Sequence, residues 1–342
     1  MDIGGFLRKE FMPQDKTTRS GRNLYFDFLK VLAAFLTVFY HFSYYTLDYG
    51  FVAESTSSYL PNVSRILMCF SACCVPLFFI INGALMFSRK RSIKDVYFKA
   101  LKILILIFLW RFAGFPSWFF RTLFFLYLAF PLLQWLYTKH RKVIVALCVA
   151  VFIFPFLYNF VLTAIKGAGI EAITLPLCTI NVSSLSVTGA ATGYSLLYFL
   201  LGPILKEMKT PKPLLSVITI LTGWALVVAE CTIYTNINDT MYDGVNIAFP
   251  TVGALLLSMG VFTLAKNFTF TKIQKPLGFI SGGILHIYLM HVAFINLFSI
   301  MLHGLPSNLF LCYLGSVVVF MLCVLVGKVA DRIPVICWFF KM

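Results

Sequence analysis

Three titratable side chains, those of His41, Glu230 and His291, lie in stretches of the sequence that are otherwise apolar. An imidazole changes its protonation near neutral pH, so a histidine can act as a general base, and a second polar group usually orients it. Counted at about 1.5 Å per residue along helices, all three positions reach a similar outer-half level of a membrane. We therefore predict a polar cavity that is open to the outer half of the membrane and in which these residues serve as bases for proton transfer. The alternative is that each has its own backbone or hydroxyl partner and only holds helices together.

A second group of charges is expected at the cytoplasmic end of the helix that carries His41. Lys30 precedes His41 by eleven residues, about three helical turns, so both side chains project from one side of the helix. Asp27 can pair with Lys30, and the segment RKRSIK begins with Arg89 and contains Arg91. We predict that these residues bind an anionic ligand. The alternatives are that Lys30 only extends to the interface and that RKRSIK only marks a cytoplasmic loop.

Other polar residues in or near apolar segments are candidates for a substrate site, because a polar group in lipid is costly without a partner or a cavity. We assign Asn82, Arg111 and Arg121 to this class. His286 lies five residues before His291, about 140° around a helix, so we interpret it as structural. The sequence has nine cysteines but no paired CxxC array with histidines at metal spacing. We interpret the cysteines as small apolar side chains and expect no metal.

The elements that position these residues are predicted to be membrane helices. Of the 342 residues, 60% are hydrophobic and 12% are charged, whereas globular proteins are about half apolar and a quarter charged. A membrane helix needs about 20 mostly apolar residues, so the sequence predicts an all-α, polytopic membrane protein with about ten transmembrane helices. The expected spans are 24–46, 62–87, 97–114, 118–137, 143–165, 184–205, 214–235, 246–265, 277–300 and 308–327.

The basic residues fall on alternate loops of this plan. The formal charge of +15 is therefore explained by loops that stay in the cytoplasm, and nucleic acid is not an expected partner. Both termini are expected in the cytoplasm, with a cytoplasmic arm (1–23), a membrane domain (24–327) and a cytoplasmic tail (328–342). The other basic clusters lie at 89–94, 139–142, 206–212 and 266–275.

Four segments, in order along the chain, resemble signature segments of acyltransferase family 3, the membrane O-acyltransferases of bacterial surface polysaccharides. DFLKVLAAFLTVFYH (27–41) is similar to the family's first helix, which has an aspartate, an arginine and, after ten further residues, a histidine. Lys30 stands at the arginine position. VPLFFIINGALMF (75–87) resembles the second-helix segment, with Asn82 where a serine usually precedes the glycine.

The other two similar segments are later in the chain. RTLFFLYLAFPLL (121–133) resembles the family's helix with a Trp-Phe-Leu-Tyr motif followed by a proline. LGFISGGILHIYLMHVAF (277–294) resembles its late helix, in which a serine is followed by an Ile-Tyr-Leu-x-His motif. Tyr288 and His291 occupy the tyrosine and histidine of that motif. The four similarities together extend over most of the chain.

The resemblance implies transfer of an acyl group, most often acetyl, from cytoplasmic acetyl-CoA or another acyl-CoA to a hydroxyl of a lipid-linked or exported glycan. His41 would be the general base or carry the acyl group, and Glu230 or His291 would orient it. The implied location is the cytoplasmic membrane of a bacterial cell, crossed many times. The donor-site candidates are Asp27, Lys30, Arg89 and Arg91, and the acceptor-site candidates are Asn82, Arg111, Arg121 and Tyr288.

A glycan transporter or flippase is the main alternative, because it would also need a polar cavity with charges at the membrane midplane. A receptor-like binding protein fits poorly with the lack of large loops. Against transport, the sequence has no two halves of matching hydropathy and no glycine- or proline-broken helices in corresponding positions. The sequence leaves the oligomeric state open.

Overall fold

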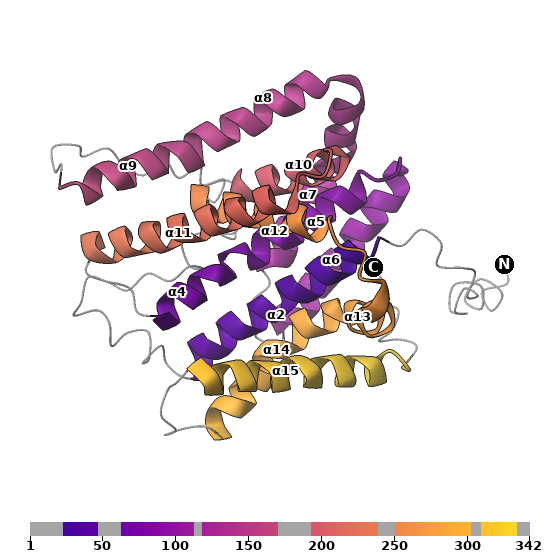
Figure 1. Cartoon of the computed structure of the whole chain (residues 1–342). Coiled ribbons are helices and arrows are strands. Elements are labelled where there is room, and N and C mark those ends of the chain that lie inside the picture. Colours follow the sequence, from indigo (N-terminus) through magenta and orange to yellow (C-terminus); the bar gives the residue numbers. More distant parts are fainter. Residues whose placement is uncertain are drawn as a thin grey trace.

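The computed structural model describes residues 23–46, 63–112, 118–169, 193–238, 250–301 and 309–333. Every regular element in these ranges is a helix, and no strand occurs in them (Figure 1). The prediction of an all-α protein is therefore confirmed for the described part of the chain. Lipid explains the choice of helices, since a helix satisfies all its backbone hydrogen bonds within one segment.

The helices follow the predicted spans closely, and each predicted range overlaps at least one of them. The first described helix is α2 (Leu24–Thr46), which matches its predicted range at both ends. The others are α4 (Val63–Cys69), η1 (Phe70–Cys73), α5 (Cys74–Met86), α6 (Ile93–Phe112), α7 (Trp118–Lys139), α8 (Arg141–Val151), η2 (Phe152–Leu157), α9 (Tyr158–Gly167), α10 (Gly193–Glu207), α11 (Pro213–Asn238), α12 (Val252–Ala265), η4 (Thr271–Ile273), α13 (Gln274–Ser281), α14 (Ile284–Met301) and α15 (Leu309–Ala330).

Seven of the described helical segments are long and apolar enough to cross a membrane. They include α2, the segment from Arg65 to Met86, and the continuous run of α8, η2 and α9 from Arg141 to Gly167. Helix α12 is apolar but shorter, and α6 carries several charged residues. A multi-pass membrane protein is therefore supported, whereas the count of ten spans stays a prediction.

One predicted span is broken in two. The sequence suggested a single helix over 277–300, but α13 ends at Ser281 and α14 begins at Ile284. Gly282 and Gly283 form the turn between them. Glycine lacks a Cβ and loses more conformational freedom in a helix than any other residue, so a glycine pair is a common place for a helix to kink or break. The apolar pattern continues across the break, which is why periodicity alone missed it.

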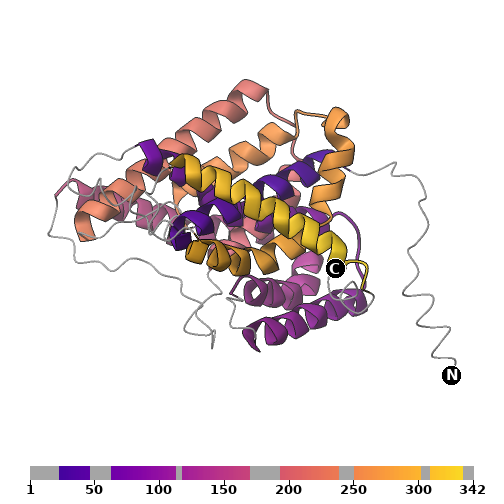
Figure 2. The same ribbon diagram turned by 90° about the horizontal axis from the view of Figure 1, so that it is seen from below.

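Helix α2 runs through the middle of the bundle in both views (Figures 1 and 2). It packs against α5, α13, α14 and α15, so the helix that carries Lys30 and His41 meets several of the helices that form the site. Helix α5 in turn packs against α10 with almost no space between the backbones: a Cβ on Gly83 would lie 1.8 Å from the carbonyl oxygen of Phe199. Small residues permit such close approach in membrane bundles.

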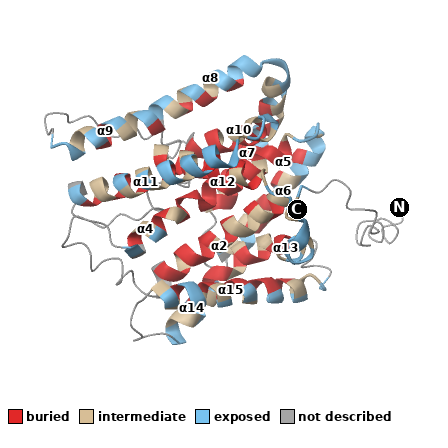
Figure 3. Cartoon of the chain, in the orientation of Figure 1, coloured by how far each residue is buried: buried red, intermediate tan, exposed pale blue. Residues whose placement is uncertain are grey.

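The outer surface of the bundle is apolar, as expected for a protein whose solvent is lipid. Large exposed side chains include Leu214 on α11, Ile300 on α14 and Phe310 on α15, each at least 70% exposed. Helices α8 and α9 lie at one edge and are exposed along much of their length (Figure 3). An apolar area of this extent on a water-soluble monomer would be an interaction surface; here it fits contact with lipid.

The basic segments meet at one end of the bundle. The Nζ of Lys206 donates to Ser88 Oγ, and the Nζ of Lys266 donates to the carbonyl oxygen of Leu205 over 2.8 Å. Arg141 forms an ion pair of 2.7 Å with Glu207. Four of the loops predicted to be cytoplasmic therefore lie together, as alternate loops of a membrane bundle must. Which side of the membrane this end faces stays a prediction.

Cysteine labelling in intact cells tests that prediction. We expect an impermeant thiol reagent to label single cysteines introduced near 50–58, 168–178 and 236–245, because these loops carry few basic residues; most of these positions lie outside the described residues. Cysteines at 206–212 should react only after the cells are opened. Labelling of 206–212 in intact cells, with protection of the other three loops, would invert the topology.

Candidate functional site

His41 and His291 form a hydrogen-bonded pair between α2 and α14. The Nδ1 atom of His41 lies 2.9 Å from Nε2 of His291, and the two ring centroids are 5.0 Å apart. His291 is 3% exposed, whereas His41 keeps part of its surface exposed. Two of the three residues that were predicted to share one layer therefore meet, although 250 positions separate them in the sequence.

The hydrogen bonds assign the protons of the pair. Nδ1 of His291 lies 2.9 Å from the carbonyl oxygen of Ile287. A carbonyl oxygen only accepts, so this nitrogen carries the proton and Nε2 of a neutral His291 has the lone pair. Nδ1 of His41 must then donate to it, which leaves the lone pair of His41 on Nε2. The basic nitrogen of a neutral His41 is thus Nε2, and His291 orients the ring through Nδ1.

A cavity of about 770 Å³ opens toward the basic end of the bundle, within the usual size range of small-molecule sites. Its walls come from α2, α5, α6, α7, α13 and α14. Lys30, Arg89, Arg91 and Lys99 supply four cationic side chains to its lining. Three of these were predicted to bind an anionic ligand; Lys99, in the second turn of α6, was not among the sequence candidates.

Polar contacts fix the walls of the cavity. The Lys30 ammonium lies 4.0 Å from the carboxylate of Asp27, which is buried. The Tyr127 hydroxyl donates to the side-chain carbonyl oxygen of Asn82 over 3.2 Å, and the Asn82 amide donates to the carbonyl oxygen of Phe78. The sequence predicted Asn82 as a binding residue, and Tyr127 adds a second polar side chain beside it.

The mouth of the cavity continues into a second hollow of about 460 Å³. This hollow shares Arg89, Arg91 and Lys99 with the cavity and is also lined by Lys90, Lys102, Asp95 and Phe98. Burial and then the neighbouring charge of Arg89 lower the pKa of Arg91, while Asp95 and Tyr127 act in the opposite direction. Cations gathered in this way repel one another, so a polyanionic ligand would relieve the repulsion.

Tyr288 connects the cavity to the histidine pair. Its ring packs against those of Phe119 and Phe120, 5.0 Å from each by ring centroids, and lies 5.9 Å from the ring of His291. Tyr288 also lines the cavity. It was predicted as an acceptor-site residue; the structure places it at the inner end of the space that carries the basic residues.

Glu230 has a different environment from the one predicted. Its buried carboxylate faces the start of α12, beside Thr251, Val252 and Gly253. A Cβ on Gly253 would lie 2.8 Å from Oε2 of Glu230. The first backbone N–H groups of a helix attract a negative charge, so this position favours the structural alternative, in which Glu230 joins α11 to α12. A catalytic role for Glu230 stays a prediction.

Two further sequence candidates, Arg111 and Arg121, lie away from the cavity. Arg111 is in the last turn of α6 and Arg121 in the first turn of α7, near enough for their charges to interact. Neither residue lines the cavity. Their part in acceptor binding stays a prediction, and it would lie outside this cavity.

His286 has its own partner, as the structural interpretation requires. Its Nε2 lies 3.3 Å from Oδ1 of Asp331 at the end of α15, and Gly327 of α15 packs on its ring. It joins α14 to α15 and takes no part in the pair formed by His41 and His291. Among the described residues, no group of three or more His, Cys, Asp or Glu side chains could hold a metal ion.

One comparison with known proteins identifies the domain. A family model described as an acyltransferase domain matches residues 23–117 and 114–327, which include both halves of the histidine pair and the whole lining of the cavity. No curated protein and no solved structure matches the chain significantly.

Proposed function

Since this chain belongs to acyltransferase family 3 and is a membrane protein of the multi-pass type, we propose that it transfers an acyl group from cytoplasmic acyl-CoA to a hydroxyl of a lipid-linked or exported glycan. Acetyl-CoA is the donor we favour. The proposed location is the cytoplasmic membrane of a bacterial cell, with the lipid bilayer as the surroundings of the bundle.

The observation that carries the proposal is the position of the histidine pair relative to the basic cavity. The cavity is lined by four basic residues, Lys30, Arg89, Arg91 and Lys99. At its inner end, Tyr288 touches His291. Guanidinium groups bind phosphates through paired hydrogen bonds and lysines bind them as point charges. The nucleotide phosphates of CoA would occupy the basic hollow, and the extended pantetheine arm would point its thioester toward the histidines.

The chemistry needs one base and one leaving group. Nε2 of His41 takes the proton of the acceptor hydroxyl as its oxygen attacks the thioester carbonyl carbon, and the electrons of the C–S bond leave with sulfur. The protonated imidazole then returns the proton to the CoA thiolate. The products are the acylated glycan and free CoA. Throughout, His291 accepts the hydrogen bond from Nδ1 of His41 and keeps the ring oriented.

An alternative covalent route also suits this arrangement. The lone pair of His41 would attack the thioester, form an acyl-imidazole and release CoA before the acceptor arrives. This route lets donor and acceptor use the site in turn from opposite sides of the membrane. Rapid mixing separates the two routes, because only the covalent one gives a burst of CoA in the absence of acceptor.

The proposal can be tested with purified protein in nanodiscs. The protein is mixed with acetyl-CoA and with a glycolipid extract of the cells that produce it. We expect CoA release that depends on the extract and a glycolipid heavier by the mass of one acetyl group. A glycan transporter would move the glycolipid across vesicle membranes and release no CoA. That result would replace the proposal with the transport alternative.

Lys30 provides a test of the donor site. We expect the Lys30→Ala variant to raise the apparent KM for acetyl-CoA by about tenfold or more, because a hydrogen bond to a charged group contributes about 1.5–3 kcal/mol. The Lys30→Arg variant should match or improve on the wild type, since a guanidinium grips phosphate at two points. An unchanged KM in folded Lys30→Ala protein would make Lys30 an interfacial anchor that only pairs with Asp27.

A further inference from the structure

A narrow void separates the large cavity from His291. Its lining includes Ala34 and Thr37 of α2, Phe78 of α5, and Tyr288 and His291 of α14. The void has no room for a water molecule. It reaches the imidazole of His291, the partner of His41, from the side on which the cavity lies.

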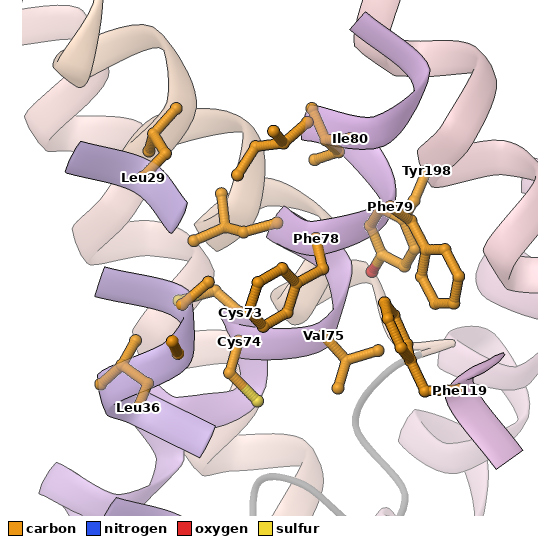
Figure 4. Packing of buried hydrophobic residues seen from close by; sticks show 14 of the residues in the cluster. Leu29, Leu36, Cys73, Cys74, Val75, Phe78, Phe79, Ile80, Phe119 and Tyr198 are labelled. Carbon is orange, nitrogen blue, oxygen red and sulfur yellow. The ribbon is translucent and has the colours of Figure 1, made fainter. Parts of the chain in front are cut away.

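Phe78 and Tyr288 form the wall between the two spaces, because both side chains line the cavity and both line the void. Phe78 is buried, at 6% exposure, and its ring lies 5.8 Å from that of Phe119. In Figure 4, Phe78 projects between the side chains Leu29 and Leu36 of α2 and the ring of Phe119. The wall is therefore built of aromatic rings held on several sides.

The two rings of the wall are held differently. Tyr288 packs against the rings of Phe119 and Phe120 and also touches His291. The Phe78 side chain instead faces the small side chains of Ala34 and Thr37 across the void. A shift of the Phe78 ring would therefore widen the void without moving Tyr288, the wall residue that touches His291.

Building on the proposed function, we infer that the thioester reaches the histidine pair between Phe78 and Tyr288, and that Phe78 limits the length of the acyl chain. The donor class is then a short-chain acyl-CoA. The void beyond the wall has no room even for a water molecule, so any acyl group must move the Phe78 ring to enter it. Because interiors are close-packed and each extra methylene forces a further costly shift, this displacement grows with the length of the acyl chain and is opposed by the contacts of Phe78.

The test compares CoA release from acetyl-CoA and hexanoyl-CoA by purified protein in nanodiscs with the glycolipid extract. We expect the wild type to prefer acetyl-CoA strongly. The Phe78→Ala variant should raise the hexanoyl-to-acetyl rate ratio by at least about tenfold, because even one methylene in an apolar pocket changes discrimination by about 10- to 200-fold. Phe79→Ala is the matched control: Phe79 is the next residue, is fully buried and also packs on Phe119, but lines neither space.

The outcomes separate this inference from the proposed function. If the wild type releases CoA from neither donor, the proposed function fails. If the wild type is active and Phe78→Ala leaves the rate ratio unchanged, or changes it no more than Phe79→Ala does, the inference is overturned. Should Phe78→Ala not fold, Phe78→Leu must raise the ratio for butyryl-CoA over acetyl-CoA, and an unchanged ratio in that variant overturns the inference equally.

Discussion

Replacing His41 with alanine is expected to lower acyl transfer by a factor of about 100 to 10,000, the usual effect of removing a general base. The His41 imidazole has Nδ1 held by His291, so Nε2 is the nitrogen that can take the acceptor's proton. If His41 carries the acyl group covalently, almost no activity should remain. The measurement is CoA released per minute by wild type and variant at matched amounts of folded, monodisperse protein.

The control for His41→Ala is the alanine variant of another buried histidine in the same bundle. His286 lies on α14 and pairs with Asp331, away from the proposed reaction. His286→Ala should therefore retain most of the turnover, even if its stability falls. A His41→Ala protein that keeps more than about a tenth of the wild-type rate would fall outside the range expected for a lost base and would make His41 a packing residue.

Replacing His291 with alanine is expected to lower kcat by about a hundredfold, because a small misplacement of a reacting group costs about that much. The variant removes the acceptor of the His41 Nδ1 proton, and a buried donor without a partner is costly, about 1–3 kcal/mol. His41 would then turn toward another partner or adopt the other tautomer. His291 is a positioning residue in this account, since it acts through His41.

A purely structural role for His291 predicts something different. Loss of packing would lower the yield and the thermal stability and leave the kcat of the folded fraction unchanged. A positioning role lowers kcat with little change in the KM for acetyl-CoA, because His291 does not line the cavity proposed to bind the donor. His291→Gln should recover part of the loss, because its amide oxygen can accept a hydrogen bond. Equal kcat values for wild type and both variants would exclude the positioning role.

The sequence by itself determined the helices and the residues that are out of place in lipid. Helix formation depends on local periodicity and length, so α2 was predicted at Leu24–Thr46 and observed there. His41, Asn82 and Lys30 were identified because a polar group in an apolar helix needs a partner or a cavity. Spacing along one helix also placed Lys30 and His41 on the same side, since a helix has a fixed rise and turn.

Tertiary structure alone decided which of these residues meet. The relative rotation and axial shift of two helices depend on side-chain packing, as where α5 meets α10 at Gly83, and a single sequence does not reveal them. Depth estimates therefore grouped Glu230 with the two histidines, whereas packing joined it to the start of α12. The same packing placed Phe78 between the basic cavity and the void that His291 lines. From its sequence Phe78 is an ordinary core phenylalanine. Its place in that wall depends on helices that lie far from it along the chain.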